Sequence, residues 1–169
     1  MNLVEQYRDE SLKFLFANNS FKSNFNRWKK PIIKNIGKIK LDSDKLLILG
    51  DKLSKIFLTT SQSGRSQKTL SNAGYHWESL ICWYLNLCLV GSNSVVIRNI
   101  KDLCPQVIND CMSVRYGTTT TNTESDLVGI TFPKSNIKVM KSFKVKDLNQ
   151  IIKKNLNKIE ICNIQCKTN

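Results

Sequence analysis

The sequence has little of what zinc sites, membrane spans and secretion signals require. It contains one histidine, His76, and no two of its six cysteines have CxxC spacing, which argues against a zinc site. No apolar run approaches the roughly 20 residues of a membrane helix. Residues 1–5 lack the basic start and apolar core of a signal peptide, and no internal repeat is present. We therefore expect a globular, cytoplasmic protein with reduced cysteines that does not enter a membrane.

Acidic residues are also scarce, since the chain has 13 Asp and Glu against 26 Lys and Arg and a net charge of +13. Such an excess usually indicates a polyanionic partner, with nucleic acid first and an anionic membrane surface second. The codon bias of an AT-rich genome stays open as an alternative, because Lys, Asn and Ile are abundant together. Residues 1–58 carry +6, residues 59–132 are neutral, and residues 133–169 carry +7. Acidic site residues are therefore expected in the neutral middle.

The spacing of apolar residues predicts a chain that mixes helices and strands. Helices are expected over residues 3–17, 43–57, 71–89 and 102–111, and another is expected to begin at Asp147 as its N-cap. Strands are expected over 94–97, 112–116, 127–132 and from Ile159 onward, with a further strand candidate in the basic segment 134–146. Residues 59–68 and the Thr-rich run 117–123 have the composition of loops. We predict an α/β (α+β) fold, with a helical, basic region over 1–70 and a mixed sheet flanked by helices over 71–169.

The basic residues outside the predicted core have two interpretations. Trp28, Lys29 and Lys30 suit base stacking and phosphate contacts. However, Phe21, Phe25 and Trp28 are spaced by four and three, and this spacing favours the core stripe of a helix. The loop 59–68 combines hydroxyl residues with two cations, as phosphate contacts do, but a solvated loop is the simpler interpretation. The candidate DNA contacts are Lys29, Lys30, Arg65, Lys68 and Arg115.

The predicted helix 71–89 is apolar nearly all round, so we expect it to be largely buried. A buried Glu78 would then need a cation, a metal or a hydrogen-bond donor. A structural ion pair with Arg98, Arg115 or Lys68 stays open. His76 is two residues away and does not face Glu78 on a helix, so we expect a surface or capping histidine and not a general base.

The last segment, residues 159–169, reads as a buried central strand that ends in two functional groups. Gln165 and Lys167 are two residues apart and therefore project from the same face. A buried lysine beside an oxygen ligand is costly unless something anionic lies there. Asp126 stands at the start of the predicted strand 127–132. Simpler roles stay open: a frayed terminal lysine, an ordinary amide at a strand end, and a carboxylate that caps the Thr-rich loop.

The polar residues that are costly to bury make a set of hard oxygen ligands. Two carboxylates, Glu78 and Asp126, together with the amide oxygen of Gln165, suit Mg²⁺, which uses one or two carboxylates and keeps several waters. An adjacent Lys167 can hold or help to deprotonate a water and neutralise charge on a phosphoryl group. The chemistry that this set favours is hydrolysis of a phosphodiester.

Two runs of the chain resemble the core of the PD-(D/E)xK nuclease superfamily, in particular bacterial type II restriction endonucleases: residues 124–130, ESDLVGI, and residues 160–169, EICNIQCKTN. The resemblance implies a restriction-endonuclease-like fold in which Asp126 is the acid of the first strand. It implies that Gln165 and Lys167 are the pair on the second strand and that Glu78 is the helix acid. Gln165 stands where the family usually has an acid, which raises the importance of Glu78 or Glu124. The family core also continues after the lysine, so we expect residues 71–169 to be a truncated core.

The resemblance implies a Mg²⁺-dependent endonuclease that hydrolyses DNA, of the kind found in restriction-modification systems. Cutting both strands of double-stranded DNA usually takes two such sites, which implies a homodimer. Two alternatives stay open. One is a non-catalytic nucleic-acid-binding domain that uses its basic flanks. The other is an inactive fragment of a split restriction enzyme, whose last strand would be left as an exposed edge.

Overall fold

The structure is a computed structural model that describes residues 2–36, 43–60, 67–122, 124–134 and 144–167. These residues form six α-helices, a three-stranded antiparallel sheet and a two-stranded hairpin, so the predicted α+β fold with its N-terminal helical region is confirmed. The chain divides into two compact units. We call residues 1–12 and 89–166 the sheet unit, and residues 13–88 and 167–169 the helical unit. The predicted division at residue 70 stays a prediction.

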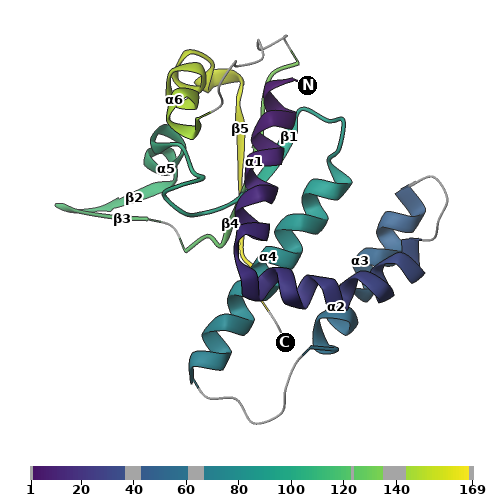
Figure 1. Ribbon diagram of the computed structural model, residues 1–169. Coiled ribbons are helices and arrows are strands. Elements are labelled where there is room, and N and C mark those ends of the chain that lie inside the picture. The colour runs from purple at the N-terminus through teal and green to yellow at the C-terminus, as the bar shows by residue number, and fades with distance from the viewer. Residues whose placement is uncertain (1, 37–42, 61–66, 123, 135–143, 168–169) are drawn as a thin grey trace. The chain divides into compact units, whose positions relative to one another are not determined.

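The sheet has the order β1-β4-β5, with β4 (Leu127–Thr131) between β1 (Ser94–Arg98) and β5 (Glu160–Ile164) (Figure 1). Both pairs are antiparallel, with Arg98 opposite Leu127 and Leu127 opposite Ile164. Strands β1 and β4 lie at the predicted positions, and most of their residues are buried. The prediction of a buried central strand at residues 159–169 is wrong, because β5 pairs only with β4 among the described residues and its side chains are exposed or half-buried.

Helix α1 (Leu3–Ala17) has the predicted bounds. Its first turns are tied to the sheet unit by side chains that donate to backbone carbonyls. The hydroxyl of Tyr7 donates to the carbonyl of Leu103, and Ser11 Oγ donates to the carbonyl of Val96 on β1 at 3.1 Å. Tyr7 and Ser11 are fully buried, so each of these bonds satisfies a hydroxyl that would otherwise be costly to bury.

Helix α5 (Gln106–Met112) leads into the hairpin of β2 (Ser113–Tyr116) and β3 (Thr119–Asn122). The helix starts four residues later than predicted, because Pro105 is its N-cap and the residue before a proline is disfavoured in helical conformation. The prediction of a loop at 117–123 is wrong for 119–122. A two-residue turn with Gly117 at φ +58° reverses the chain, and threonine, a good strand former, continues as β3.

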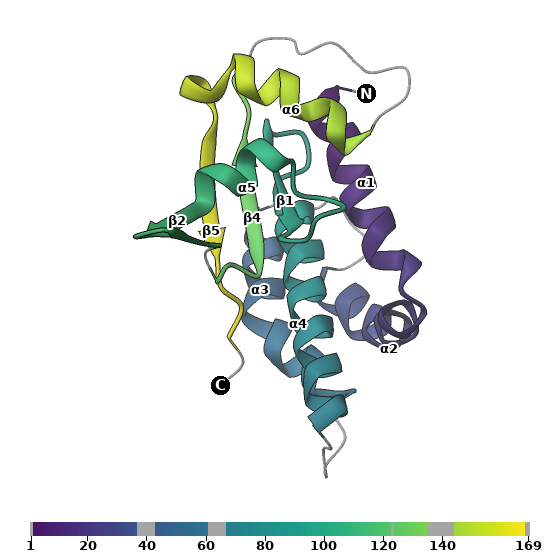
Figure 2. The same ribbon diagram turned by 90° about the vertical axis from the view of Figure 1, so that its left-hand side faces the viewer.

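Helix α6 (Val145–Lys154) packs on α5, and the short 3-10 helix η1 (Leu156–Lys158) joins it to β5. Figures 1 and 2 show α6 at the end of the sheet where β5 begins. Lys144 is the N-cap of α6. The prediction that Asp147 caps this helix is therefore wrong, and Asp147 lies in the first turn, where a carboxylate favours the helix dipole. Most of the strand candidate 134–146 falls outside the described residues.

The helical unit consists of the end of α1 together with α2 (Asn19–Ile36), α3 (Ser43–Leu58) and α4 (Gln67–Cys88). Its core is aromatic. Trp28 is fully buried between Phe21 and Phe57, with ring centroids 6.0 and 5.7 Å away. The indole Nε1 of Trp28 donates to Thr60 Oγ1 at 3.0 Å. The core interpretation of Phe21 and Trp28 is confirmed, and a buried Trp28 does not stack on a base.

Two further findings concern the described residues as a whole. None of their helices is long and apolar enough to cross a membrane. All six cysteines belong to the described residues and form no disulfide there, with Cys82 and Cys104 buried and Cys88, Cys111 and Cys162 exposed. Burial raises the pKa of the Cys104 thiol to about 11, so this cysteine stays protonated at neutral pH and packs as a small apolar side chain.

Candidate active site

Asp126 is held at the point where the middle strand of the sheet begins. Its carbonyl accepts from the backbone N–H of Asn99 at 3.0 Å, and its own N–H donates to the carbonyl of Ile164 at 3.1 Å. The residue is therefore tied to the chain that follows β1 and to the end of β5. Its side chain is half-buried. Backbone bonds on both sides fix where the Asp126 side chain leaves the sheet.

The carboxylate of Asp126 closes the end of β5. Its Oδ2 accepts a 2.6 Å hydrogen bond from the backbone N–H of Cys166. A carboxylate that accepts from a backbone N–H makes a strong, charge-assisted bond. Asp126 is thus hydrogen-bonded to the backbone of residues 165–167, and its predicted alternative role as a cap of the Thr-rich loop involves residues outside the described ones.

Gln165 follows β5 directly and reaches back to the segment before β4. Its Nε2 donates to the carbonyl of Glu124 at 2.6 Å. The amide nitrogen is used by this bond, which leaves the amide oxygen Oε1 as the ligand atom of this side chain. Gln165 is exposed, so its predicted place in a buried strand is wrong. The structure does bring Asp126, Gln165 and the backbone of Glu124 to one end of the sheet.

The remaining two predicted catalytic residues belong to the helical unit. Lys167 comes directly after Cys166 and is exposed, so the predicted burial of its ammonium is wrong. Glu78 lies on α4, where it is half-buried because the helix is less enclosed than its composition predicts. Of the four predicted catalytic residues, the sheet unit therefore contains Asp126 and Gln165.

His76 is buried, with 8 % of its surface exposed, so the expectation of a surface or capping histidine is wrong. Its Nδ1 lies 3.0 Å from Asn24 Nδ2, an amide donor, and its ring contacts Phe21. Burial lowers the pKa of His76, which favours the neutral imidazole at physiological pH. These contacts give His76 a packing role in the aromatic core of the helical unit.

The structure describes only some of the predicted DNA contacts. Lys29 and Lys30 are exposed on α2. Arg65 lies outside the described residues. The backbones of Lys68 and Arg115 lie in α4 and β2, but their side chains are outside the part of the chain that the structure describes.

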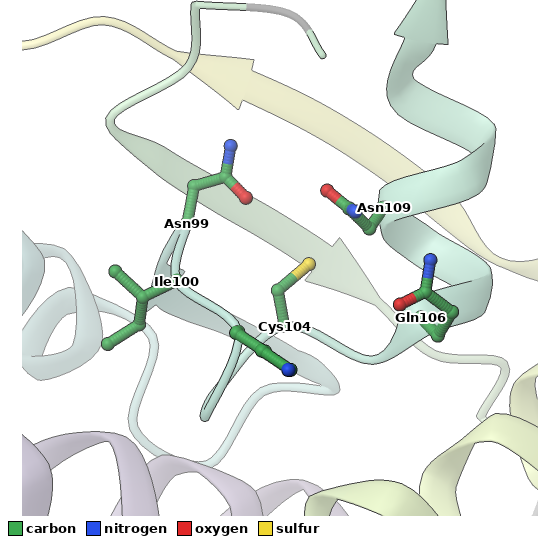
Figure 3. Close-up of a pocket in the computed structure, with 6 residues that line it drawn as sticks. Asn99, Ile100, Cys104, Gln106 and Asn109 are labelled. Carbon is green, nitrogen blue, oxygen red and sulfur yellow. The ribbon is translucent and has the colours of Figure 1, made fainter. Parts of the chain in front are cut away.

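A polar pocket of about 250 Å³ lies beside the chain that holds Asp126. Figure 3 shows the side chains of Asn99, Cys104 and Asn109 pointing into the same space. Asn99 connects this pocket to Asp126, because its backbone N–H donates to the Asp126 carbonyl and its Nδ2 donates to the carbonyl of Ser125 at 3.0 Å. The lining residues are Asn99, Ile100, Lys101, Cys104, Gln106 and Asn109.

Sequence reasoning missed this pocket and the role of Asn99. The sequence places Asn99 only one residue beyond a strand, where an amide is common. Its position opposite Asp126 follows from the register of β1 and β4, and a register is set by long-range pairing. The sequence offered one signal: Asn99 comes directly after β1, and Asp126 comes directly before β4.

The described residues contain no group of three or more His, Cys, Asp or Glu side chains that could hold a metal ion. The predicted Mg²⁺ ligands are two carboxylates and an amide, and they are split between the two units. The scan against protein-family models and the searches of curated proteins and of solved structures found no match for the chain.

Proposed function

We propose that the chain is a Mg²⁺-dependent endonuclease that hydrolyses the phosphodiester bonds of double-stranded DNA, of the restriction-modification type. One observation carries the proposal: Asp126 precedes β4, the Gln165-x-Lys167 pair follows β5, and the Asp126 carboxylate accepts a hydrogen bond from Cys166 N–H between the two members of that pair. In an antiparallel pair, the start of one strand lies beside the end of the next. This geometry is why two short motifs 39 residues apart in sequence reach the same end of the sheet.

The order of the elements gives further support. Helix α4, which contains Glu78, is followed along the chain by three strands that pair antiparallel in the order β1-β4-β5. The resemblance to the PD-(D/E)xK superfamily implies a first acid on one strand, an acid-x-Lys pair on the next, and a helix acid before both. The chain has these groups in that order, with Gln165 in place of the second acid.

The ligand atoms at this sheet end fit a hard divalent cation. Asp126 offers a carboxylate whose second oxygen, Oδ1, is not the atom bonded to Cys166, and Gln165 offers Oε1. One or two carboxylates completed by neutral oxygens and waters are what Mg²⁺ prefers. Bound Mg²⁺ would supply Lewis-acid activation of a water and of the phosphoryl oxygens. Water molecules would complete the coordination of the ion at this sheet end.

The protein's own groups have distinct tasks in the proposed reaction. Asp126 is oriented before substrate arrives, because two backbone bonds and the Cys166 N–H fix it. Lys167 holds the attacking water and offsets the negative charge that develops on the phosphoryl group. As Lys167 is exposed, its ammonium stays hydrated until it approaches a phosphate, and the folded protein bears no cost of burying it.

Supercoiled plasmid incubated with the protein and millimolar Mg²⁺ should give discrete bands, and chelation of the metal should abolish them. We expect Asp126→Asn to reduce the cleavage rate by at least about 10²-fold, since loss of a ligand charge weakens metal binding. Asparagine retains an acceptor for Cys166 N–H, so the fold is preserved. Asp102→Asn, the same change at an exposed acid of the sheet unit, is the matched control. Equal cleavage by wild type and D126N would refute the proposed site.

The second candidate, a non-catalytic nucleic-acid-binding domain, is favoured by a specific observation. Both members of the QxK pair are exposed, and Asp126 is already used by Cys166 N–H, so the sheet end is also explained as a closed strand terminus. The two candidates differ in one experiment. Retarded migration of a duplex without any cleavage, unchanged by Lys167→Ala, supports the binding domain and contradicts the endonuclease.

A further inference from the structure

Helix α6 is the most strongly amphipathic helix of the sheet unit. Leu148 and Ile152 are fully buried on its inner face. The side chain of Asn149 fixes the helix to its neighbour, because Asn149 Oδ1 accepts from the backbone N–H of Val107 at the start of α5 at 3.0 Å. An inner face that is packed and hydrogen-bonded holds the outer face in a defined orientation.

The outer face of α6 and its flanks carry an excess of exposed cations. Five lysines in residues 144–158 are exposed, whereas the single acid of this segment, Asp147, is half-buried. Lys146, Gln150 and Lys154 follow one another at intervals of four and therefore lie along one ridge, about 12 Å from end to end. They border a groove of about 370 Å³ that Asp147 and Ile151 also line. The exposed lysines are Lys144, Lys146, Lys153, Lys154 and Lys158.

We propose that this lysine face of α6 binds the phosphate backbone of double-stranded DNA. The choice of DNA as the polyanion rests on the proposed function. Lysine ammonium groups act as point charges toward phosphates, and such contacts release counterions and give affinity without reading sequence. An amide such as that of Gln150 is the other usual donor to phosphate oxygens.

The position of α6 in the sheet unit sets the distance between the proposed DNA contacts and Asp126. Helix α6 leads through η1 into the start of β5 (Figure 2). Asp126 is hydrogen-bonded to Ile164 and Cys166 at the other end of β5. Five residues of antiparallel strand span about 17 Å, and each base pair advances about 3.4 Å along the duplex. A duplex that runs along β5 would therefore place the α6 contacts about five base pairs from the phosphate at Asp126.

The exposed side chains on the two faces of β5 are compatible with such a path. Cys162 and Asn163 are exposed and uncharged, and the one acid of the strand, Glu160, lies at the α6 end. Glu160 would repel a backbone beside it, but the five exposed lysines of residues 144–158 outnumber it. Among the described residues β5 pairs with β4 alone, so its other edge provides a route between the lysine face and Asp126.

The test removes three charges from α6 and three from elsewhere. The variant K146Q/K153Q/K154Q is compared with K22Q/K34Q/K55Q, which changes exposed lysines of α2 and α3. Binding of a fluorescent duplex of about two helical turns is followed by anisotropy without Mg²⁺, over a range of salt concentrations. We expect the α6 variant to bind at least about tenfold more weakly and to flatten the salt slope by about 0.9 for each phosphate that a lysine no longer neutralises. The control variant should stay within about twofold of wild type.

Each outcome decides a separate point, with circular dichroism confirming that both variants are folded. Equal weakening by the two variants overturns the α6 proposal in favour of a diffuse charge effect. Loss of binding to anionic vesicles, with duplex binding unchanged, overturns it in favour of a lipid surface. Binding that depends on α6 without any cleavage supports the α6 site while refuting the endonuclease. Where cleavage occurs, wild type should cut substrates that end within about five base pairs of the cut more slowly than longer substrates. The α6 variant should cut short and long substrates at the same low rate. If substrate length has no effect on wild type, the proposed distance is contradicted.

Discussion

The two compact units of the chain are stabilised by different interactions. In the helical unit, aromatic rings pack on one another, as Phe21, Trp28, Phe57 and Trp77 do with centroids 5.1 to 6.0 Å apart. In the sheet unit, buried polar side chains from α1 donate to backbone carbonyls around β1. Ring packing tolerates small shifts, whereas hydrogen bonds fix positions within tenths of an ångström. In the unit that contains Asp126, directional bonds from α1 therefore add to the packing of the apolar core.

The largest effect is expected from the aromatic core. Trp28→Ala removes a fully buried indole and should lower the free energy of unfolding by about 3–5 kcal/mol. Amide hydrogen exchange should rise in α2, α3 and α4 and stay slow in β1 and β4. Trp28→Phe, which keeps a ring but loses the bond to Thr60, should cost less. A uniform rise in both units after W28A would show that they unfold together and would remove the contrast.

A smaller effect in the opposite unit is expected from Arg8. This arginine is 2 % exposed, and its Nη2 donates to the carbonyls of Leu89 and Ser94. Arg8→Met should cost about 1–3 kcal/mol, because the Ser94 carbonyl loses a charged donor while Leu89 keeps its bonds from Ser92. Exchange should rise in β1 and at the start of α1. Lys134→Met, at an exposed position of the sheet unit, is the control and should have little effect.

Fold class and most elements could be predicted because they depend on local pattern. The apolar spacing of residues 3–17 matches α1, and the β-branched run at 94–97 matches β1. The burial of β5 could not be predicted, since Ile159, Ile161 and Ile164 suit a central strand equally well. Whether a strand has one neighbour or two is decided by the rest of the chain, and here β5 pairs with β4 alone among the described residues.

The candidate site could be predicted from the sequence to a similar extent. Asp126 before one strand and Gln165 after another are visible in the sequence, and antiparallel pairing brings them together. The bond from Cys166 N–H to Asp126 depends on a register that no local pattern contains. The burial of Glu78 was overestimated for a related reason. An apolar helix predicts burial, but the half-buried state of Glu78 depends on which parts of the chain cover α4.

Substitution of Asn99 should loosen the segment that positions Asp126, because the Asn99 side chain donates to the carbonyl of Ser125. Asn99→Ala removes the 3.0 Å bond from the amide to the Ser125 carbonyl and keeps the backbone bond to Asp126. We expect a loss of about 1 kcal/mol in the free energy of unfolding. If the proposed function holds, cleavage should fall several-fold more than stability accounts for, because the Asp126 carboxylate is less well oriented. Asn109→Ala, which faces the same pocket without touching Ser125 or Asp126 by a described bond, should leave stability nearly unchanged, and an equal effect of both variants would contradict this role.

The smallest effect concerns pH and the polar anchor of α1. Partial burial raises the pKa of Glu5, but hydrogen bonds from Arg8 and from the backbone N–H of Gly91 outweigh it, so the pKa lies below its ordinary value. A lowered pKa in the folded state means that the unfolded chain binds the proton more tightly. The stabilisation from Glu5 is therefore complete above the ordinary pKa of 4.5 and is lost as the pH falls through the lowered value. Thermal unfolding of wild type and Glu5→Gln should differ near neutral pH and converge in acid, with the lost protection located at the start of α1 and at Gly91. If the difference in unfolding temperature persists unchanged into acid, Glu5 acts by packing and not by charge. The stability of the sheet unit would then depend less on buried polar interactions of α1, and the two units would differ less than described above.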